Sequence, residues 1–301
     1  MSETDVAQPP VEASTEATGA TEVPKEAVEP QNELTKQFTD AEWAALKEFR
    51  EKLPAIYRAA YAPADEAAEP KTFNLWGIDI NPTAPAQDAR VSVVLMKFLR
   101  ARELRVSDAE TMLVATLRWR EEFKINELLN EEFPQDVFGG IGHVFGHDKD
   151  GRPVTYNLYG GGIDMTPVFS DVKRFIRWRV QLMEKTVRTL DYEKYDQMVQ
   201  VHDYAGVNFL GGRDANQKAA ASEATKIFQD YYPEFLSTKF FINVPTFAAW
   251  IFWFFKSLLS SKTFAKMSVV GPGEKTVKAA LIPVIDVKEL PKRYGGEADA
   301  F

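Results

Sequence analysis

The sequence predicts an α/β protein in which a helical amino-terminal lobe, residues 36–133, precedes a mixed sheet backed by helices, residues 134–301. Three observations predict this division. Apolar residues recur at helical spacing before Pro134, short β-branched or aromatic runs alternate with helical segments after it, and the first 35 residues contain no aromatic side chain. Alternation of short strand-like and longer helical segments is typical of α/β folds.

Residues 1–35 are expected to form a disordered acidic tail. They hold eight acidic residues, one lysine and four prolines, and ordering them would cost entropy that no buried apolar surface offsets. The rest of the chain carries 36 acidic and 35 basic residues, so the formal net charge of −8 comes from the tail. Because the folded part is nearly neutral, its charge gives no support to nucleic-acid binding.

The amino-terminal lobe is predicted to contain three helices. Thr39 and Glu42 have the spacing of a capping box, which opens the first helix. Ser107 and Glu110 repeat that spacing before the third helix. Residues 63–85, between the first and second helices, predict a polar loop. The helices are expected over residues 39–62, 91–102 and 107–123.

The carboxy-terminal part is predicted to contain five strands and three long helices. The strands are expected over residues 142–146, 154–159, 198–202, 239–244 and 267–270, and the helices over residues 170–190, 214–231 and 246–256. Residues 148–153 have the composition of a hairpin turn, and the three glycines at 160–162 are expected to turn a corner. The glycines match neither a phosphate loop nor a dinucleotide fingerprint.

Composition and spacing exclude several kinds of site. The chain has no cysteine, which excludes disulfides, thiolate metal sites and cysteine nucleophiles, and which fits a reducing compartment. His143 and His147 are four residues apart, but on a strand and its turn this spacing separates them by about 13 Å, too far for a zinc pair. Asp148 and Asp150 beside Gly151 lack the remaining ligands of a calcium loop.

The protein is expected to be cytoplasmic. Its first residues have neither the basic start nor the apolar run of a secretory signal. Its most apolar stretch, residues 247–255, is about half as long as the ~20 residues that cross a bilayer. This stretch is apolar around the whole helix circumference, which indicates either a core helix or a lid that faces lipid on one side.

Arg179 is the first candidate ligand-binding residue. It falls in the middle of the apolar stripe of the helix predicted at residues 170–190, whereas the other basic residues of that helix point away from the stripe. Because an unpaired guanidinium that faces a core is costly, Arg179 is expected to meet an anion. Two partners remain open: an internal Asp or Glu, or a carboxylate or phosphate of a bound ligand.

His202 and Tyr204 are the second candidate site. They are two residues apart on a predicted strand, so both side chains point to the same face, and Tyr159 ends the adjacent strand. A satisfied core pair is one interpretation of these residues. The other is a phenolate that ligates ferric haem, with nearby cations holding the propionates.

Several short motifs are spread along the chain. They are Lys97-Phe98-Leu99-Arg100-Ala101-Arg102, Trp119-Arg120, Asp150-Gly151-Arg152-Pro153-Val154, Asp203 with Gly206, Tyr231-Tyr232-Pro233-Glu234, Ile242-Asn243-Val244-Pro245, and Leu290-Pro291 with Tyr294-Gly295-Gly296. Together these motifs resemble the CRAL-TRIO, or Sec-fourteen-like, lipid-transfer family. They run in family order from about residue 38 to the end of the chain. The resemblance implies a helical lobe, a CRAL-TRIO mixed sheet backed by helices, and a deep apolar pocket closed by a mobile gate helix at residues 246–260.

Within this family, three segments resemble a fungal branch that binds haem and transfers phosphatidylinositol. The segments are Asn157-Leu158-Tyr159-Gly160, Gln200-Val201-His202-Asp203-Tyr204, and Tyr232-Pro233-Glu234 with Lys239. The resemblance implies that haem b is contacted by Tyr159, Arg179, His202, Tyr204 and Lys239. Tyr204 is then the axial ligand of the iron and His202 assists it, while Arg179 and Lys239 neutralise the propionates.

The same resemblance implies an inositol-headgroup site. Glu234 corresponds to a headgroup contact, and Thr263 and Lys266 lie where the contacts of the gate region fall. Phe235 stands where the family usually has an arginine after this glutamate. The sequence therefore predicts a headgroup site that has one cation fewer.

The resemblance implies a carrier and no enzyme activity. Its expected ligands are phosphatidylinositol, moved between membranes, and haem b, with no nucleic acid. Its expected location is the cytoplasm, with transient peripheral association to the endoplasmic reticulum or other membranes. Two alternatives stay open: a lipid carrier without haem, and a haem-dependent peroxidase-like enzyme, since tyrosinate ligation also occurs in catalase.

Overall fold

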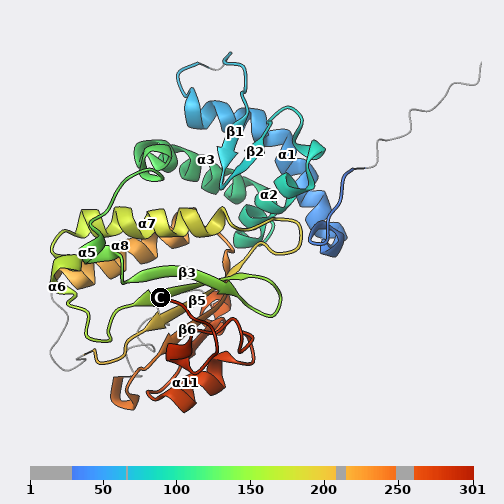
Figure 1. Cartoon of the computed structure of the whole chain (residues 1–301). Helices are drawn as coiled ribbons and strands as arrows, with labels where there is room; N and C mark the ends of the chain where they lie inside the picture. The colour runs from blue at the N-terminus through green and yellow to red at the C-terminus, as the bar shows by residue number, and fades with distance from the viewer. Residues whose placement is uncertain (1–28, 66, 208–214, 249–260) are drawn as a thin grey trace, which may run out of the picture.

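The helices of the amino-terminal lobe pack against one another above the sheet (Figure 1). The computed structural model describes residues 29–65, 67–207, 215–248 and 261–301. In the amino-terminal lobe these residues form α1 (Asp40–Tyr61), α2 (Ala89–Ala101) and α3 (Val106–Glu122), followed by the short helices α4 (Ile125–Leu128) and α5 (Gln135–Phe138). The three helices predicted from the apolar spacing are confirmed.

Helix α1 begins at the predicted capping box, but α3 does not. The hydroxyl of Thr39 accepts from the amide of Glu42 at 3.2 Å, and the carboxylate of Glu42 accepts from the amide of Thr39 at 2.9 Å. The capping box at Ser107 was wrong. Helix α3 begins one residue earlier, at Val106, so Ser107 lies inside the first turn, where its carbonyl accepts from the hydroxyl of Thr111.

The polar loop predicted over residues 63–85 was also wrong in part, because it contains a small antiparallel hairpin. Its strands are β1 (Phe73–Leu75) and β2 (Ile78–Ile80). Each strand has only three residues, too few to produce an alternation that sequence analysis can recognise. Trp76, at the turn, is completely buried and stacks on Phe98 with ring centroids 5.6 Å apart.

The end of the predicted acidic tail is ordered. Asn32 donates its side-chain amide to the carbonyl of Tyr192 at 2.8 Å, and Thr35 is fully buried at the start of η1 (Thr35–Gln37). Residues 29–35 therefore contact the folded part, which corrects the tail prediction for this segment. Residues 1–28 lie outside the described part of the chain.

The second lobe contains a mixed five-stranded sheet with the strand order β3-β4-β5-β6-β7. Strand β3 is antiparallel to β4, and the pairs β4–β5, β5–β6 and β6–β7 are parallel. The strands span Gly142–His147, Pro153–Leu158, Met198–Asp203, Leu236–Ile242 and Met267–Val269. All five predicted strands are confirmed, and the largest difference is that β6 begins at Leu236 instead of residue 239.

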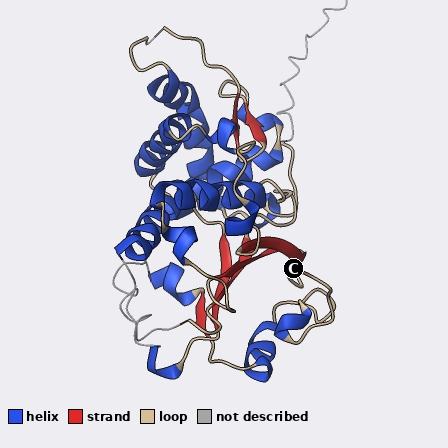
Figure 2. Cartoon of the chain, turned by 60° about the vertical axis from the view of Figure 1, so that its left-hand side comes forward, coloured by secondary structure: helices blue, strands red, loops and turns tan. Residues whose placement is uncertain are grey.

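Helices cover both faces of the sheet (Figure 2). One face is covered by α7 (Val172–Val187) and α8 (Ala215–Tyr231), which confirm two predicted helices, and the other by α11 (Glu274–Leu281). The remaining short helices are η2 (Pro85–Gln87), α6 (Thr166–Phe169), η3 (Thr246–Ala248), α10 (Ser261–Ala265) and η4 (Lys292–Tyr294). Of the helix predicted at residues 246–256, η3 is described, and residues 249–260 lie outside the described part.

The two faces of the central strands differ in chemistry. On β5, Val199 and Val201 pack with Leu281 of α11 in an apolar core. Because side chains alternate along a strand, Gln200 and His202 point to the opposite face, toward α7 and α8. Polar side chains therefore gather on the face that α7 and α8 cover, whereas on the other face Asp203, buried at the end of β5, accepts from the hydroxyl of Tyr294.

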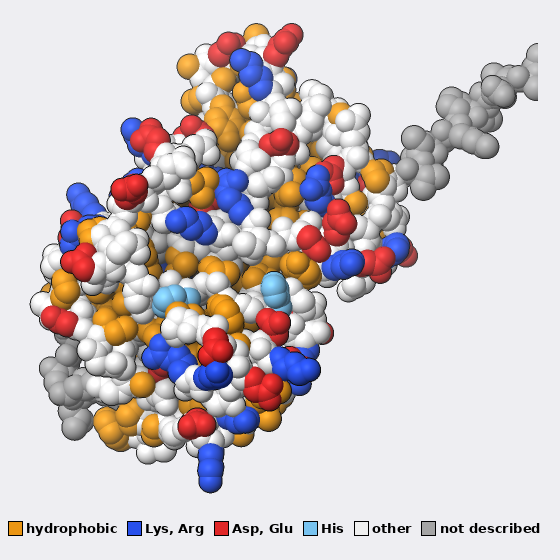
Figure 3. All heavy atoms as spheres, viewed as in Figure 1, with side chains coloured by type: hydrophobic (Ala, Val, Ile, Leu, Met, Phe, Trp, Pro, Cys, Tyr) orange, Lys and Arg blue, Asp and Glu red, His pale blue; other side chains and the backbone are white. Residues whose placement is uncertain are grey.

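Two further properties concern membranes and surface charge. No helix in the described part of the chain is both long and apolar enough to cross a membrane. On the face of the molecule seen in Figure 3, basic and acidic side chains are interspersed without a large region of one sign. This pattern agrees with the nearly neutral charge of the chain beyond its acidic tail.

Candidate functional site: a buried polar cluster beneath α7

Polar side chains from β4, β5, β6 and α7 meet on the face of the sheet that α7 and α8 cover. We call this group the buried polar cluster and define it as the buried residues Asn157, Arg179 and His202 together with the half-buried residues Tyr159, Tyr204 and Lys239. In the sheet register, Asn157 is the direct neighbour of His202, and Lys239 is the direct neighbour of Gln200. The structure thus brings the five predicted haem-contacting residues into one region.

Arg179 has no internal acidic partner within the described residues. Its side chain lies on α7, is 4% exposed, and places its guanidinium carbon 4.9 Å from the ring centroid of Phe228 on α8. No Asp or Glu side chain in the described ranges forms an ion pair with it. The interpretation that Arg179 forms a structural bridge to an internal carboxylate is therefore not supported by the described part of the chain.

His202 is buried with one ring nitrogen unsatisfied. The residue is 7% exposed, and its Nε2 atom has no hydrogen-bond partner. Its ring contacts Tyr159 and Phe241 edge-on, with centroids 5.4 Å and 5.5 Å away. Burial, together with the charges of Lys239 and Arg179, holds the pKa of His202 well below its ordinary value, so the imidazole is neutral at pH 7.

Lys239 adds a second cation on β6. Its ammonium nitrogen lies 5.2 Å from the ring centroid of Phe241. Burial, and secondarily the charge of Arg179, lowers the pKa of Lys239 to about 7. An anion placed beside these two side chains would raise the pKa of Lys239 again, because it would favour the charged ammonium group and offset the positive charge of Arg179.

Backbone hydrogen bonds hold the two tyrosines at the ends of adjacent strands. The amide of Tyr159 donates to the carbonyl of Asp203 at 2.9 Å, and the amide of Tyr204 donates to the carbonyl of Ile242 at 3.1 Å. The carboxylate of Asp203 accepts from the hydroxyl of Tyr294 at 3.0 Å. The tyrosine rings lie 5.7 Å apart, which is close enough for one planar ligand to contact both.

Sequence analysis missed Asn157 as a site residue. It is completely buried, and both its side-chain nitrogen and its side-chain oxygen lack hydrogen-bond partners. One signal could have identified it: Asn157 on β4 lies two positions before Tyr159, which directly follows the strand, so both side chains are expected on the same face of the sheet.

The residues of the buried polar cluster fit a haem group. The phenol of a tyrosine can ligate iron, and a neutral imidazole with an unsatisfied nitrogen can assist it. The two cations, which have no acidic partners in the described ranges, can bind the two propionates. The same region does not suit a bare metal ion, because no three His, Asp or Glu side chains gather for one among the described residues. The two histidines of β3 lie elsewhere, and His143 stacks on Phe301.

The predicted headgroup residues form a separate charged cluster at the start of β6. The carboxylate of Glu234 lies 2.9 Å from Nζ of Lys262 and 3.5 Å from Nζ of Lys266. Partial burial opposes ionisation of Glu234, but hydrogen bonding and charge from the two lysines outweigh it, so the pKa of Glu234 lies below its ordinary value. Thr263 follows Lys262 on α10 (Ser261–Ala265), and Lys266 comes directly after this helix. Lys262 was missed as a contact of Glu234 because only the tertiary fold brings them together.

Phe235 points into the core instead of toward the charged cluster. It is 2% exposed and contacts Trp76 edge-on at 4.6 Å. Beside it, the fully buried Lys97 of α2 donates to the carboxylate of Asp196 at 2.7 Å and to the carbonyl of Glu234 at 3.2 Å. The helical lobe is thus attached directly to the backbone of the headgroup candidate.

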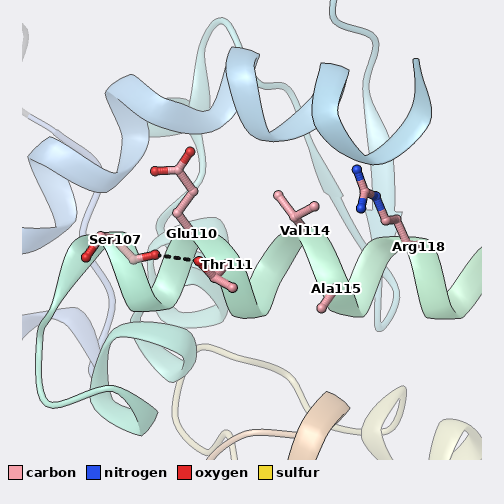
Figure 4. A pocket seen from close by; sticks show the side chains of 6 residues that line it. All are labelled: Ser107, Glu110, Thr111, Val114, Ala115 and Arg118. Atoms are coloured by element: carbon pink, nitrogen blue, oxygen red, sulfur yellow. Dashed lines mark hydrogen bonds between the residues drawn. The ribbon is translucent and has the colours of Figure 1, made fainter. Parts of the chain in front are cut away.

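A recess on the surface of α3 is a separate feature (Figure 4). It is lined by Ser107, Glu110, Thr111, Val114, Ala115 and Arg118. Arg118 at its end donates to the carbonyl of Ala59 on α1 at 2.7 Å. None of the predicted site residues lies in this recess, so it does not contribute to either cluster.

The fold defines a class of protein: an α/β protein with a helical amino-terminal lobe and a mixed five-stranded sheet. Family models match both lobes. The CRAL/TRIO domain matches residues 138–296, and the CRAL/TRIO N-terminal domain matches residues 45–115. The chain therefore belongs to the CRAL/TRIO family.

Similar proteins are found among fungi. A phosphatidylinositol transfer protein sfh5 of Neosartorya fischeri is 35% identical, with 99% of this chain and 74% of the relative covered. Proteins of the same name from Botryotinia fuckeliana and Aspergillus oryzae are 36% and 37% identical, with 84% and 74% of this chain covered. Of those two relatives, the matches cover only 57% and 51%. A crystal structure of Sfh5 is 28% identical, has a TM-score of 0.71, and is matched over 87% of this chain and 89% of its own.

Proposed function

We propose that this protein is a haem-binding carrier of phosphatidylinositol. The observation that carries the haem part is the charge and hydrogen-bond imbalance of the buried polar cluster. Arg179 and Lys239 lack acidic partners in the described residues, and the Nε2 atom of His202 lacks any partner. Buried charges and polar groups are normally compensated, so this region fits a ligand that brings anionic groups.

Five residues of the cluster have separate roles in this proposal. Bound haem supplies a ferric iron, for which a tyrosine oxygen is a known ligand. Tyr204 provides that oxygen, and neutral His202 assists it as a hydrogen-bonding group. Arg179 and Lys239 bind the carboxylates, and Tyr159 lies against the rings of both His202 and Tyr204.

The lipid part of the proposal rests on the relatives, which are named phosphatidylinositol transfer proteins, and on the charged cluster of Glu234, Lys262 and Lys266. Lipid transfer requires no catalytic residue. The protein needs only to replace the bilayer around the acyl chains, where each buried CH₂ contributes about 0.8 kcal/mol relative to water. As a carrier it works in the cytoplasm and associates transiently with the endoplasmic reticulum or other membranes.

Absorption spectroscopy tests the haem proposal. Protein purified from haem-supplied cells is expected to be coloured and to have a Soret band, which Tyr204→Phe loses or shifts strongly. Tyr57→Phe, a phenol on α1 distant from the cluster, is the matched control and is expected to keep the wild-type spectrum. A colourless wild-type protein, or a Tyr204→Phe spectrum equal to that of wild type, would contradict haem ligation by Tyr204.

A lipid carrier without haem is the second candidate, favoured by the separate charged cluster at Glu234. Transfer of labelled phosphatidylinositol between vesicles distinguishes the two. Lys266→Met is expected to slow transfer, whereas Lys218→Met, an exposed lysine on α8, is not. Transfer by a colourless protein supports the second candidate, and peroxide turnover by a coloured protein would support an enzyme instead.

A further inference from the structure

Asn157 is a buried amide without a hydrogen-bond partner. The residue is 0% exposed, and neither its Nδ2 nor its Oδ1 atom forms a hydrogen bond. Leaving both atoms of a side-chain amide unsatisfied is expensive, and most buried polar groups in proteins have a partner. Burial of Asn157 therefore lowers the stability of the ligand-free protein, and no hydrogen bond within the sheet offsets this loss.

The location of Asn157 indicates where a partner would lie. Its neighbours Tyr156 and Leu158 pack into the apolar core beside α11, so Asn157 points to the opposite face, toward the buried polar cluster. Its direct neighbour across β5 is His202, whose Nε2 is also unsatisfied. Two adjacent polar groups that do not satisfy each other are explained most simply by a third group that contacts both.

The surrounding charge decides the chemistry of that third group. Arg179 and Lys239 act electrostatically on His202, and neither has an acidic partner in the described ranges. An amide N–H donor beside the histidine on which both cations act suits an anionic oxygen. We propose that Asn157 is a ligand-binding residue whose amide donates to an anionic oxygen, a carboxylate or a phosphate, of the molecule held in the buried polar cluster.

This inference rests on the proposed function only in requiring that a ligand occupies the cluster. It adds a residue that also selects the ligand. Because the amide is neutral, it selects ligands by the position of their anionic oxygen and not by their total charge. It favours a ligand with an anionic oxygen that reaches β4 as well as the cations on α7 and β6.

The proposal separates stability from binding in a way that a structural role does not. In Asn157→Leu, two unsatisfied polar atoms are replaced by an apolar group of similar size, so the ligand-free protein is expected to keep or raise its melting temperature. Its affinity for the ligand is expected to fall about ten- to hundredfold, as for a lost hydrogen bond to a charged group. A structural asparagine would give the reverse pattern.

The experiment uses the full chain and two probes, ferric haem in an absorbance titration and phosphatidylinositol vesicles in a binding assay. Thr155→Val is the matched control. Thr155 is also buried, lies two residues earlier on β4, and already donates to the carbonyl of Val199. This variant is expected to lower the melting temperature slightly and to leave both affinities unchanged.

Asn157→Asp provides a second variant should the leucine protein fail to fold. A carboxylate at this position would neutralise the cationic cluster from within and repel an anionic ligand. The ligand-free protein is then expected to melt at a higher temperature, and its affinity for the anionic ligand to fall at least as far as in the leucine variant.

The outcomes identify the ligand group. Weakened binding of haem alone supports a propionate carboxylate, and weakened binding of the lipid alone supports a phosphate. Unchanged affinity for both in the variants, with normal binding by wild type, overturns the inference while leaving the proposed function intact, and an ordered water between Asn157 and His202 then explains the site. Failure of wild type to bind either probe overturns both.

Discussion

Lys239 makes the stability of the ligand-free protein depend on pH in a direction that the structure fixes. Its pKa is about 7 in the folded protein and about 10.4 in the unfolded chain. Between these values the unfolded chain carries a proton on Lys239 that the folded protein has released. Because the unfolded state binds more protons, the free energy of unfolding increases as the pH rises from about 7 toward 10.

The size of the effect follows from the same difference. One pKa unit corresponds to about 1.4 kcal/mol, so raising the pH from about 7 to about 9 adds at most about 2 kcal/mol from this residue. The value is an upper limit for two reasons. At pH 7 about half of the folded molecules already have a deprotonated Lys239, and the side chain retains some solvent accessibility. In Lys239→Met this contribution is absent at every pH.

Urea unfolding curves at several pH values between 7 and 9 measure this contribution. The difference in unfolding free energy between wild type and Lys239→Met is expected to change by up to about 2 kcal/mol across the range, in favour of wild type at high pH. Lys218→Met, an exposed lysine on α8, controls for the loss of one positive charge. A difference that stays constant with pH, or that changes in the opposite direction, would refute the assignment of a depressed pKa to Lys239.

Three further predictions concern the cap of α1 and two contacts that hold the lobes together. Thr39→Ala removes the cap of α1 and is expected to destabilise the protein by about 1 kcal/mol in denaturant unfolding, and no change would mean that Glu42 alone satisfies the helix end. Glu184→Gln breaks a buried two-point ion pair with Arg120 and is expected to cost about 3 to 5 kcal/mol, so a loss below about 1 kcal/mol would contradict its structural role. Lys97→Met removes the buried hydrogen bonds to Asp196 and to the carbonyl of Glu234. It is expected to lower the melting temperature and to weaken phosphatidylinositol binding. An affinity equal to that of wild type would show that the headgroup cluster does not depend on α2.

Structural features that depend on the periodicity of side chains within a single helix or strand could be predicted from the sequence. The apolar stripe of α7 identified Arg179 as buried, and the two-residue spacing of His202 on β5 and Tyr204 directly after it placed both on one face of the sheet. The hairpin around Trp76 was missed because three-residue strands are too short to establish a period.

Features that depend on register or on tertiary contacts could not be predicted in this way. Asn157 becomes informative only when it is known to lie directly beside His202 and to lack a partner. Lys262 contacts Glu234 from a helix 28 residues later in the chain. The choice between an acidic neighbour and a ligand for Arg179 likewise required the positions of every described carboxylate.

We propose above that the buried polar cluster holds an anionic ligand that the chain itself does not supply. Native mass spectrometry of the purified protein, combined with its absorption spectrum, tests this claim most directly. The expected result is protein carrying the mass of haem b together with a Soret band, and phosphatidylinositol after exposure to lipid vesicles. Protein that retains neither molecule after incubation with both would contradict the account.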